Sequence, residues 1–210
     1  MPDVNTGFDL VSQPWIPVLG ADGVVRKQSL VQAFSDAPSS VEIVGEVPTQ
    51  GFAILRVMLA ILHRAVKNPV TDVCGPDDAE QWADMRRDWP AVTRRVNDYL
   101  AEHRDRFDLF HPQVPFFQVA ELRTAKDEVS RLEKLIVDVP NGAPFFTTRL
   151  GRGLARISAA EAARWLIHVQ AFDASGIRSG AGQLRGPAEK PAGKSHSIRV
   201  GSPPSPGLIQ

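Results

Sequence analysis

The fold is decided by residues 48–64, which read PTQGFAILRVMLAILHR. Apolar side chains cover nearly every face of a helix over this stretch; they are Phe52, Ile54, Leu55, Val57, Met58, Leu59, Ile61 and Leu62. A helix that is apolar all round is buried, so we expect this one to be the central element of the core. Arg56 interrupts the pattern, and because an unpaired charge is costly to bury we expect it to be exposed or paired.

The residues before this helix predict a β-hairpin and a short helix. Residues 15–18 and 24–27 have strand-like sequences on either side of the turn sequence GADG at 20–23. Pro14 and Pro17 favour an edge position for the first strand, because proline cannot donate to a ladder. Ser29 is then expected to cap a short helix that reaches Phe34.

The residues after it predict three more helices. They are expected over residues 76–85, 90–100 and 158–172. Ser158 and Glu161 have the spacing of a capping box at the start of the last one. Residues 107–119 are rich in aromatics and prolines, which favours extended segments over helix. The apolar periodicity of residues 132–137 fits a helix or a strand.

These elements indicate an α+β fold, a helix-dominated N-terminal domain with short β-hairpins over residues 1–182. Residues 183–210 contain five prolines and four glycines and no apolar periodicity. Such a composition predicts a disordered C-terminal tail or a truncated one.

Composition restricts the setting and the partners. The chain is 43% hydrophobic and 23% charged and has a single cysteine, so an intrachain disulfide is excluded and a cytoplasmic location is expected. No stretch predicts a signal peptide or a membrane span. The net charge is zero, yet from Arg149 onward nine basic residues face three acidic ones. This asymmetry suggests either an anionic partner at that end or a solvated basic face.

The sequence contains no recognisable catalytic or metal-binding arrangement. None of the five histidines forms a zinc-binding pair, and neither a nucleophile elbow nor a phosphate-binding loop is present. His63 is better explained as a core or boundary residue. We therefore predict that the protein is not an enzyme and has no metal and no cofactor.

Residues 141–149, which read NGAPFFTTR, are the first candidate binding segment. An ordered loop here could stack a base on Phe145 or Phe146 and hold a phosphate with Thr147 and Arg149. The alternative is a strand that buries one phenylalanine and leaves the other at an edge.

Residues 175–180, which read SGIRSG, are the second. Ser175, Gly176, Ser179 and Gly180 are small enough to let backbone approach a sugar-phosphate chain, and Arg178 supplies charge. The alternative is that glycine here only terminates the preceding helix.

The order of several short motifs adds a resemblance to these physical arguments. The motifs are FDL at 8–10, PWIPV at 14–18, LRVMLAILHR at 55–64, RFDLF at 106–110, PFFQV at 115–119, PFFT at 144–147, AAEAARWL at 159–166 and QAFD at 170–173 with SGIRSG at 175–180. Each is weak alone, but in this order the chain resembles the CasA family, the large subunit of the type I-E CRISPR Cascade. The resemblance spans residues 8 to about 182, and the family's proteins are more than twice this length.

The resemblance implies a non-catalytic subunit of an antiviral surveillance complex. Its partners would be the other Cascade subunits, the guide RNA, duplex target DNA and the helicase-nuclease recruited to Cascade. Residues 145–147 would contact the region of the guide's 5′ handle, and residues 175–180 would lie against the DNA motif next to the target. The alternative function is a stand-alone structural or protein-interaction domain with a basic binding end.

Overall fold

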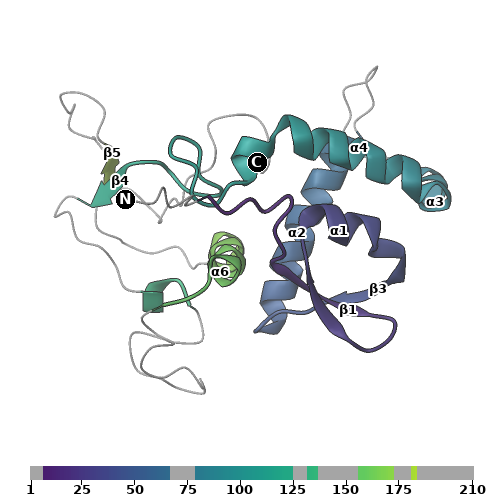
Figure 1. Cartoon of the computed structure of the whole chain (residues 1–210), viewed down its shortest axis with the longest axis horizontal. Helices are drawn as coiled ribbons and strands as arrows, with labels where there is room; N and C mark the ends of the chain where they lie inside the picture. Colours follow the sequence, from purple (N-terminus) through teal and green to yellow (C-terminus); the bar gives the residue numbers. More distant parts are fainter. Residues whose placement is uncertain (1–6, 67–78, 125–131, 137–155, 173–180, 184–210) are drawn as a thin grey trace, which may run out of the picture.

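A computed structural model describes residues 7–66, 79–124, 132–136, 156–172 and 181–183 of the chain (Figure 1). In chain order its elements, with η for 3-10 helices, are β1 (Ile16–Gly20), β2 (Val25–Gln28), α1 (Leu30–Ser35), η1 (Ala37–Ser39), β3 (Ser40–Ile43), α2 (Pro48–Ala65), α3 (Ala79–Arg87), α4 (Trp89–Glu102), η2 (Arg104–Phe107), β4 (Leu122–Thr124), η3 (Leu132–Lys134), α6 (Ala159–Phe172) and β5 (Ala181–Gln183). The expected α+β class, dominated by helix, is confirmed.

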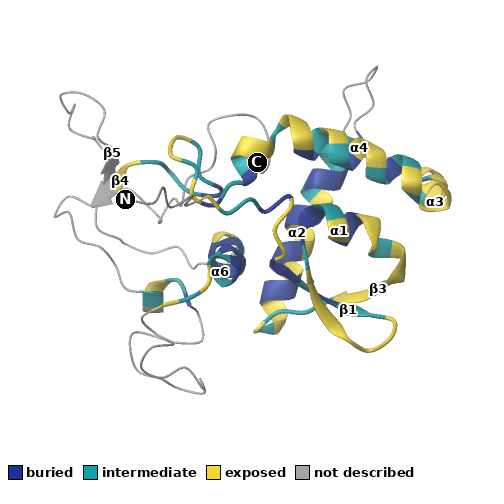
Figure 2. Cartoon of the chain, in the orientation of Figure 1, coloured by how far each residue is buried: buried dark blue, intermediate teal, exposed yellow. Residues whose placement is uncertain are grey.

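Helix α2 is the centre of the packing, as its sequence predicts. It packs against α4 and α6, and one side of it is buried (Figure 2). Its Ile54 and Ile61 side chains are fully buried in the core. The expected burial holds for only part of the helix surface, because Phe52, Leu55 and Leu59 are exposed. Neighbouring elements cover only part of its circumference and leave an apolar face open.

The N-terminal sheet has the strand order β2-β1-β3, with both pairings antiparallel. The hairpin is confirmed, but the predicted edge position of its first strand is wrong, because β1 lies in the centre. Pro17 lies just outside the β1–β3 register, which begins at Val18 opposite Ile43. The Pro17 carbonyl accepts from the Val44 amide at 2.8 Å, and because proline has no N–H the bond in the opposite direction cannot form.

Local signals explain the connections around the hairpin. Gly23 has a positive φ of 75° in the turn, a conformation that glycine adopts without strain. A hydrogen bond from Arg26 lowers the pKa of Asp22 in the same turn to about 2. Ser29 caps α1 as predicted, in a reciprocal capping box with Gln32.

Helices α3 and α4 extend the core beside α2. Asp88 accepts from the Ala91 amide at the start of α4, with Pro90 in the first turn as predicted, and the helix buries Val92, Val96 and Leu100. The indole of Trp89 donates to the carbonyl of Phe34 at 2.7 Å and so ties α4 to α1. The expected helix over 76–85 is confirmed from Ala79 onward; residues 76–78 lie outside the described residues.

Phe107 is the last residue of η2, and residues 108–119 follow it without forming a helix, mostly as turns and bends and not as the expected strands. Asp9 and Asp108 form an isolated antiparallel bridge, which brings the start of the chain against this segment. The rings of Phe107 and Phe116 stack with their centroids 6.0 Å apart in the core. Residues 132–134 form only a 3-10 turn, so neither a regular helix nor a strand describes them.

Candidate nucleic-acid interface

All nine candidate residues predicted from the sequence lie outside the described residues. They are Phe145, Phe146, Thr147, Arg149, Ser175, Gly176, Arg178, Ser179 and Gly180. The structure does describe α6, which separates the two candidate segments along the chain. What the structure shows of the candidate interface is therefore α6, the contacts that hold this helix, and the residues at which the chain enters and leaves it.

Helix α6 begins where the sequence predicts. The hydroxyl of Ser158 accepts from the Glu161 amide at 3.2 Å, which satisfies one of the free N–H groups of the first turn. Trp165 is fully buried and packs with Ile136, which follows η3. The first candidate segment, residues 141–149, thus lies in sequence between two positions, Ile136 and Trp165, that pack against each other.

A buried arginine anchors the middle of α6. Arg164 is 6% exposed, and its guanidinium forms an ion pair with Glu46 at 2.8 Å. The same group donates to the carbonyl oxygens of Trp15 at 3.1 Å and Ala160 at 3.2 Å. One side chain therefore connects α6 to the start of β1 and to the segment before α2. Because such bonds need a particular distance and angle, they hold the helix in one position in addition to the burial of its apolar side chains.

One turn later, His168 connects α6 directly to the first turn of α2. Its Nε2 atom is 2.9 Å from the Thr49 hydroxyl, while the side chain is 3% exposed. Its Nδ1 atom is buried and has no hydrogen-bond partner among the described residues. Burial lowers the pKa of His168, because the protonated ring would lose its hydration.

The last residue of α6 reaches the exposed face of α2. The ring of Phe172 lies 5.2 Å from that of His168 and 6.3 Å from that of Phe52, centroid to centroid. The chain therefore enters residues 173–180 from a helix end that contacts the core on its inner side and solvent on its outer side.

The far end of the second candidate segment is also tied to structure. Strand β5 pairs with β4 in antiparallel register, with Ala181 opposite Thr124 and Gln183 opposite Leu122 (Figure 1). Residues 173–180 thus connect the end of α6 to strand β5, which is paired with β4. Strand β5 includes Gln183, one residue past the predicted domain boundary, and residues 184–210 lie outside the described residues.

The described residues contain no group of three or more histidine, cysteine, aspartate or glutamate side chains placed to hold a metal ion. His63 is half-buried and packs edge-on against Trp82, with the ring centroids 5.6 Å apart, which confirms the boundary position predicted for it. None of the described helices has the length and apolarity needed to cross a membrane.

Comparison with known proteins identifies the family. Residues 9–202 match the family described as CRISPR-associated protein Cse1. The chain belongs to the Cse1 family. The match confirms the resemblance to CasA drawn from the sequence, and it extends beyond residue 182, where that resemblance ends.

The Cse1 relatives are much longer than this chain. CasA/Cse1 of Thermus thermophilus is 33% identical over 190 residues, which are 88% of this chain and 36% of that protein. The crystal structure of Thermobifida fusca Cse1 is 47% identical with a TM-score of 0.71, covering 83% of this chain and 32% of that one. Cse1 of Acidimicrobium ferrooxidans is 32% identical with a TM-score of 0.70, covering 95% and 34%. The chain therefore spans about a third of the length of these relatives.

A chain of a CRISPR RNA-guided surveillance complex also shares the fold, at 22% identity and a TM-score of 0.60. It covers 86% of this chain and 40% of that one. At this identity the likeness concerns the fold alone.

Sequence reasoning misses the side chains that hold α6 in place. From the sequence, Arg164 is only one of the basic residues near the C-terminal end. Nothing there predicts its ion pair with Glu46 or the contact of His168 with α2. A signal is present in the spacing, because Arg164 and His168 are four residues apart and follow Ala160 on one helix face. Helical spacing shows that they share a face, but their partners Trp15, Glu46 and Thr49 come from distant parts of the chain.

Proposed function

We propose that this chain acts as a non-catalytic subunit of a type I-E Cascade surveillance complex. In this role residues 145–147 and Arg149 contact the guide RNA in the region of its 5′ handle, and residues 175–180 contact the motif next to the DNA target. The observation that carries the proposal is the Cse1 family match, because residues 9–202 include both segments. The fold shared with a chain of a CRISPR RNA-guided surveillance complex is consistent with it.

The way α6 is held supports a binding role for residues 173–180. The segment starts at a helix end fixed through Arg164 and His168 and finishes at a strand paired with β4. A segment held at both ends loses less conformational freedom when it binds than a free tail does. Its glycines and Arg178 suit close contact with a sugar-phosphate backbone.

The proposed partners follow from this role. They are the other Cascade subunits, guide RNA, duplex target DNA and the recruited helicase-nuclease. Guide pairing would read the target sequence, and the protein would read only the adjacent motif and the backbone. The absence of catalysis is part of the proposal.

The test is to add the chain to a Cascade assembly that lacks its Cse1 subunit and measure binding at several salt concentrations. Contacts to phosphates release counterions, so affinity should fall steeply with salt, and Arg178→Ala should reduce the slope by about one. Arg95→Ala is the matched control, because Arg95 is exposed on α4, away from both segments in the sequence. Salt-insensitive binding would favour the alternative, a protein-interaction domain.

The same assay tests the aromatic segment with Phe145→Ala and Phe146→Ala. Loss of an aromatic stacked on a base should weaken binding by about 5- to 150-fold at unchanged melting temperature. Loss of a buried phenylalanine would instead reduce fold stability by about 3–5 kcal/mol. We expect one position to behave in each way. If both variants only destabilise the fold, the segment is structural and the site assignment is wrong.

A further inference from the structure

The two halves of helix α6 are held on the rest of the protein in different ways. The N-terminal half contains Arg164, whose guanidinium has one carboxylate and two carbonyl acceptors, and the fully buried Trp165. In the C-terminal half, residues 168–172, the only buried polar side chain is His168. Its Nε2 atom lies 2.9 Å from the Thr49 hydroxyl and forms a polar contact between this half and α2.

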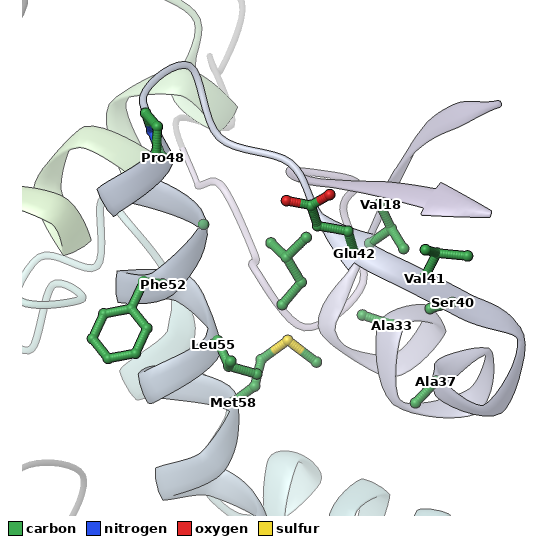
Figure 3. A pocket seen from close by; sticks show the side chains of 12 residues that line it. Val18, Ala33, Ala37, Ser40, Val41, Glu42, Pro48, Phe52, Leu55 and Met58 are labelled. Atoms are coloured by element: carbon green, nitrogen blue, oxygen red, sulfur yellow. The ribbon is translucent and has the colours of Figure 1, made fainter. Parts of the chain in front are cut away.

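Two further contacts of the C-terminal half are long or exposed. The Gln170 amide donates to the Phe117 carbonyl oxygen at 3.4 Å, near the upper limit for a hydrogen bond. The ring of Phe172 lies 6.3 Å from that of Phe52, and these side chains are 42% and 55% exposed. Figure 3 shows the Phe52 ring on α2 directed away from strand β3. Of these three contacts, only that of His168 is both short and made by a buried side chain.

Among the described residues around His168, no carboxylate is placed to pair with a protonated ring. On α6 the charged side chains are Glu161, two helical turns away, and Arg164, one turn away. Arg164 pairs with Glu46 at 2.8 Å, so the charge of this carboxylate is already neutralised. The first turns of α2, residues 48–55, contain no ionisable side chain.

The remaining neighbours of the ring are two aromatic side chains. Its centroid lies 5.6 Å from that of Trp165, edge-on, and 5.2 Å from that of Phe172. Lys134 of η3, the element beside Trp165, is exposed. The Nδ1 atom of His168 is buried and has no partner among the described residues. These surroundings favour the neutral ring, and burial accordingly lowers the pKa of His168.

We propose that His168 is a pH-sensitive contact built into the fold: its neutral ring holds the C-terminal half of α6 on α2, and its protonation releases that half. A protonated ring would lose its hydration in the folded state and would lie one turn from the guanidinium of Arg164. Opening of one helix end exposes the ring to water at a smaller cost than unfolding of the whole domain. The half around Arg164 and Trp165 stays in place. The inference goes beyond the proposed nucleic-acid contacts and does not depend on them.

Amide hydrogen exchange of the 210-residue chain tests this release. The amides of residues 169–172 donate to carbonyls four residues earlier, so their exchange reports the opening of this end of α6. Exchange is measured at about pH 7.5 and about pH 5.5, on either side of the unfolded pKa of about 6.5, and corrected for the intrinsic effect of pH. Because the folded pKa is lowered, the opening equilibrium should rise about three- to tenfold at the lower pH. The amides of residues 96–100 on α4 should show no such rise.

Two variants show whether the rise comes from His168. His168→Gln removes the titrating group and keeps an amide that can bond the Thr49 hydroxyl, so its corrected exchange should be the same at both pH values. His63→Gln removes another histidine, half-buried at the other end of α2, and should keep the full rise. No rise in the native chain, an equal rise in His168→Gln, or an equal rise at residues 96–100 would overturn the proposal.

An NMR titration of the His168 ring in the native chain provides the test if His168→Gln fails to fold. The ring should titrate below the unfolded pKa of about 6.5, and exchange at residues 169–172 should rise between that pKa and the pKa of the folded ring. A ring that titrates at or above the unfolded value, or exchange that does not rise in this range, would contradict the proposal.

Discussion

Helices α2 and α6 each carry an arginine in the middle of an apolar stretch, Arg56 in α2 and Arg164 in α6, and the two have opposite environments. Arg56 lies exposed on the open face of α2, whereas Arg164 is 6% exposed on the inner face of α6. Arg164 is buried because the Glu46 carboxylate and the Trp15 carbonyl meet it there. The comparison teaches that distant acceptors decide whether a charge in such a helix is buried.

The two helices also contribute different kinds of contact to the core. Helix α2 fits against its neighbours with aliphatic side chains such as Ile54 and Ile61. Helix α6 adds polar bonds from Arg164 and His168 to its own apolar packing. Apolar packing gives the larger share of stability, while directional bonds define where the end of α6 lies.

The largest effect is expected on the buried face of α2. Ile61→Ala should reduce the free energy of unfolding by about 2–5 kcal/mol, because it removes a fully buried side chain and leaves a cavity. Leu55→Ala, on the exposed face of the same helix, should change it by no more than about 0.5 kcal/mol. Urea unfolding of both variants measures the difference. Similar losses at the two positions would contradict the two-faced description of α2.

Much of the fold could be predicted because its signals are local. Ser29, Pro90 and Ser158 each mark a helix start within one turn of sequence, and the turn at Gly23 marks the hairpin. These features depend on backbone geometry that neighbouring residues determine.

The predictions that failed depend on contacts between distant residues. Nothing near Pro17 indicates that β3 pairs on its far side, and nothing within α2 indicates which of its faces stays open. The candidate site shows the same limit, since physical reasoning left residues 145–149 and 175–180 with structural alternatives. The resemblance singled them out, and the structure adds how α6 between them is held.

The second prediction compares the two arginines directly. Arg164→Met keeps most of the length of the side chain but removes the donor to the Trp15 carbonyl and the ion pair with Glu46. We expect a loss of about 2–3 kcal/mol, below that of a fully buried pair, because the Glu46 side chain is 30% exposed and can be partly hydrated. Arg56→Met should stay within about 0.5 kcal/mol. Chemical denaturation at one pH measures the free energy of unfolding of both variants. If Arg164→Met lost no more of it than Arg56→Met, the Arg164 contacts would contribute no net stability.

The smallest effect concerns His168, the second polar contact of α6. Burial lowers its pKa in the folded protein, so the folded state binds fewer protons than the unfolded state in the range where the ring titrates. Stability from the neutral ring is therefore complete above the unfolded pKa of about 6.5 and decreases as the pH falls through and below it.

Protonation would add a proton to a ring whose Nδ1 has no acceptor among the described residues, one turn from the guanidinium of Arg164. A single group changes the free energy of unfolding by at most about 1.4 kcal/mol per pH unit. His168→Gln is the matched variant, because a glutamine amide can still bond the Thr49 hydroxyl and does not titrate. Urea midpoints measured from about pH 8 to about pH 5.5, a range that spans the unfolded pKa, should fall further for the native protein than for this variant. Parallel curves would mean that the neutral ring contributes nothing specific to holding α6 on α2.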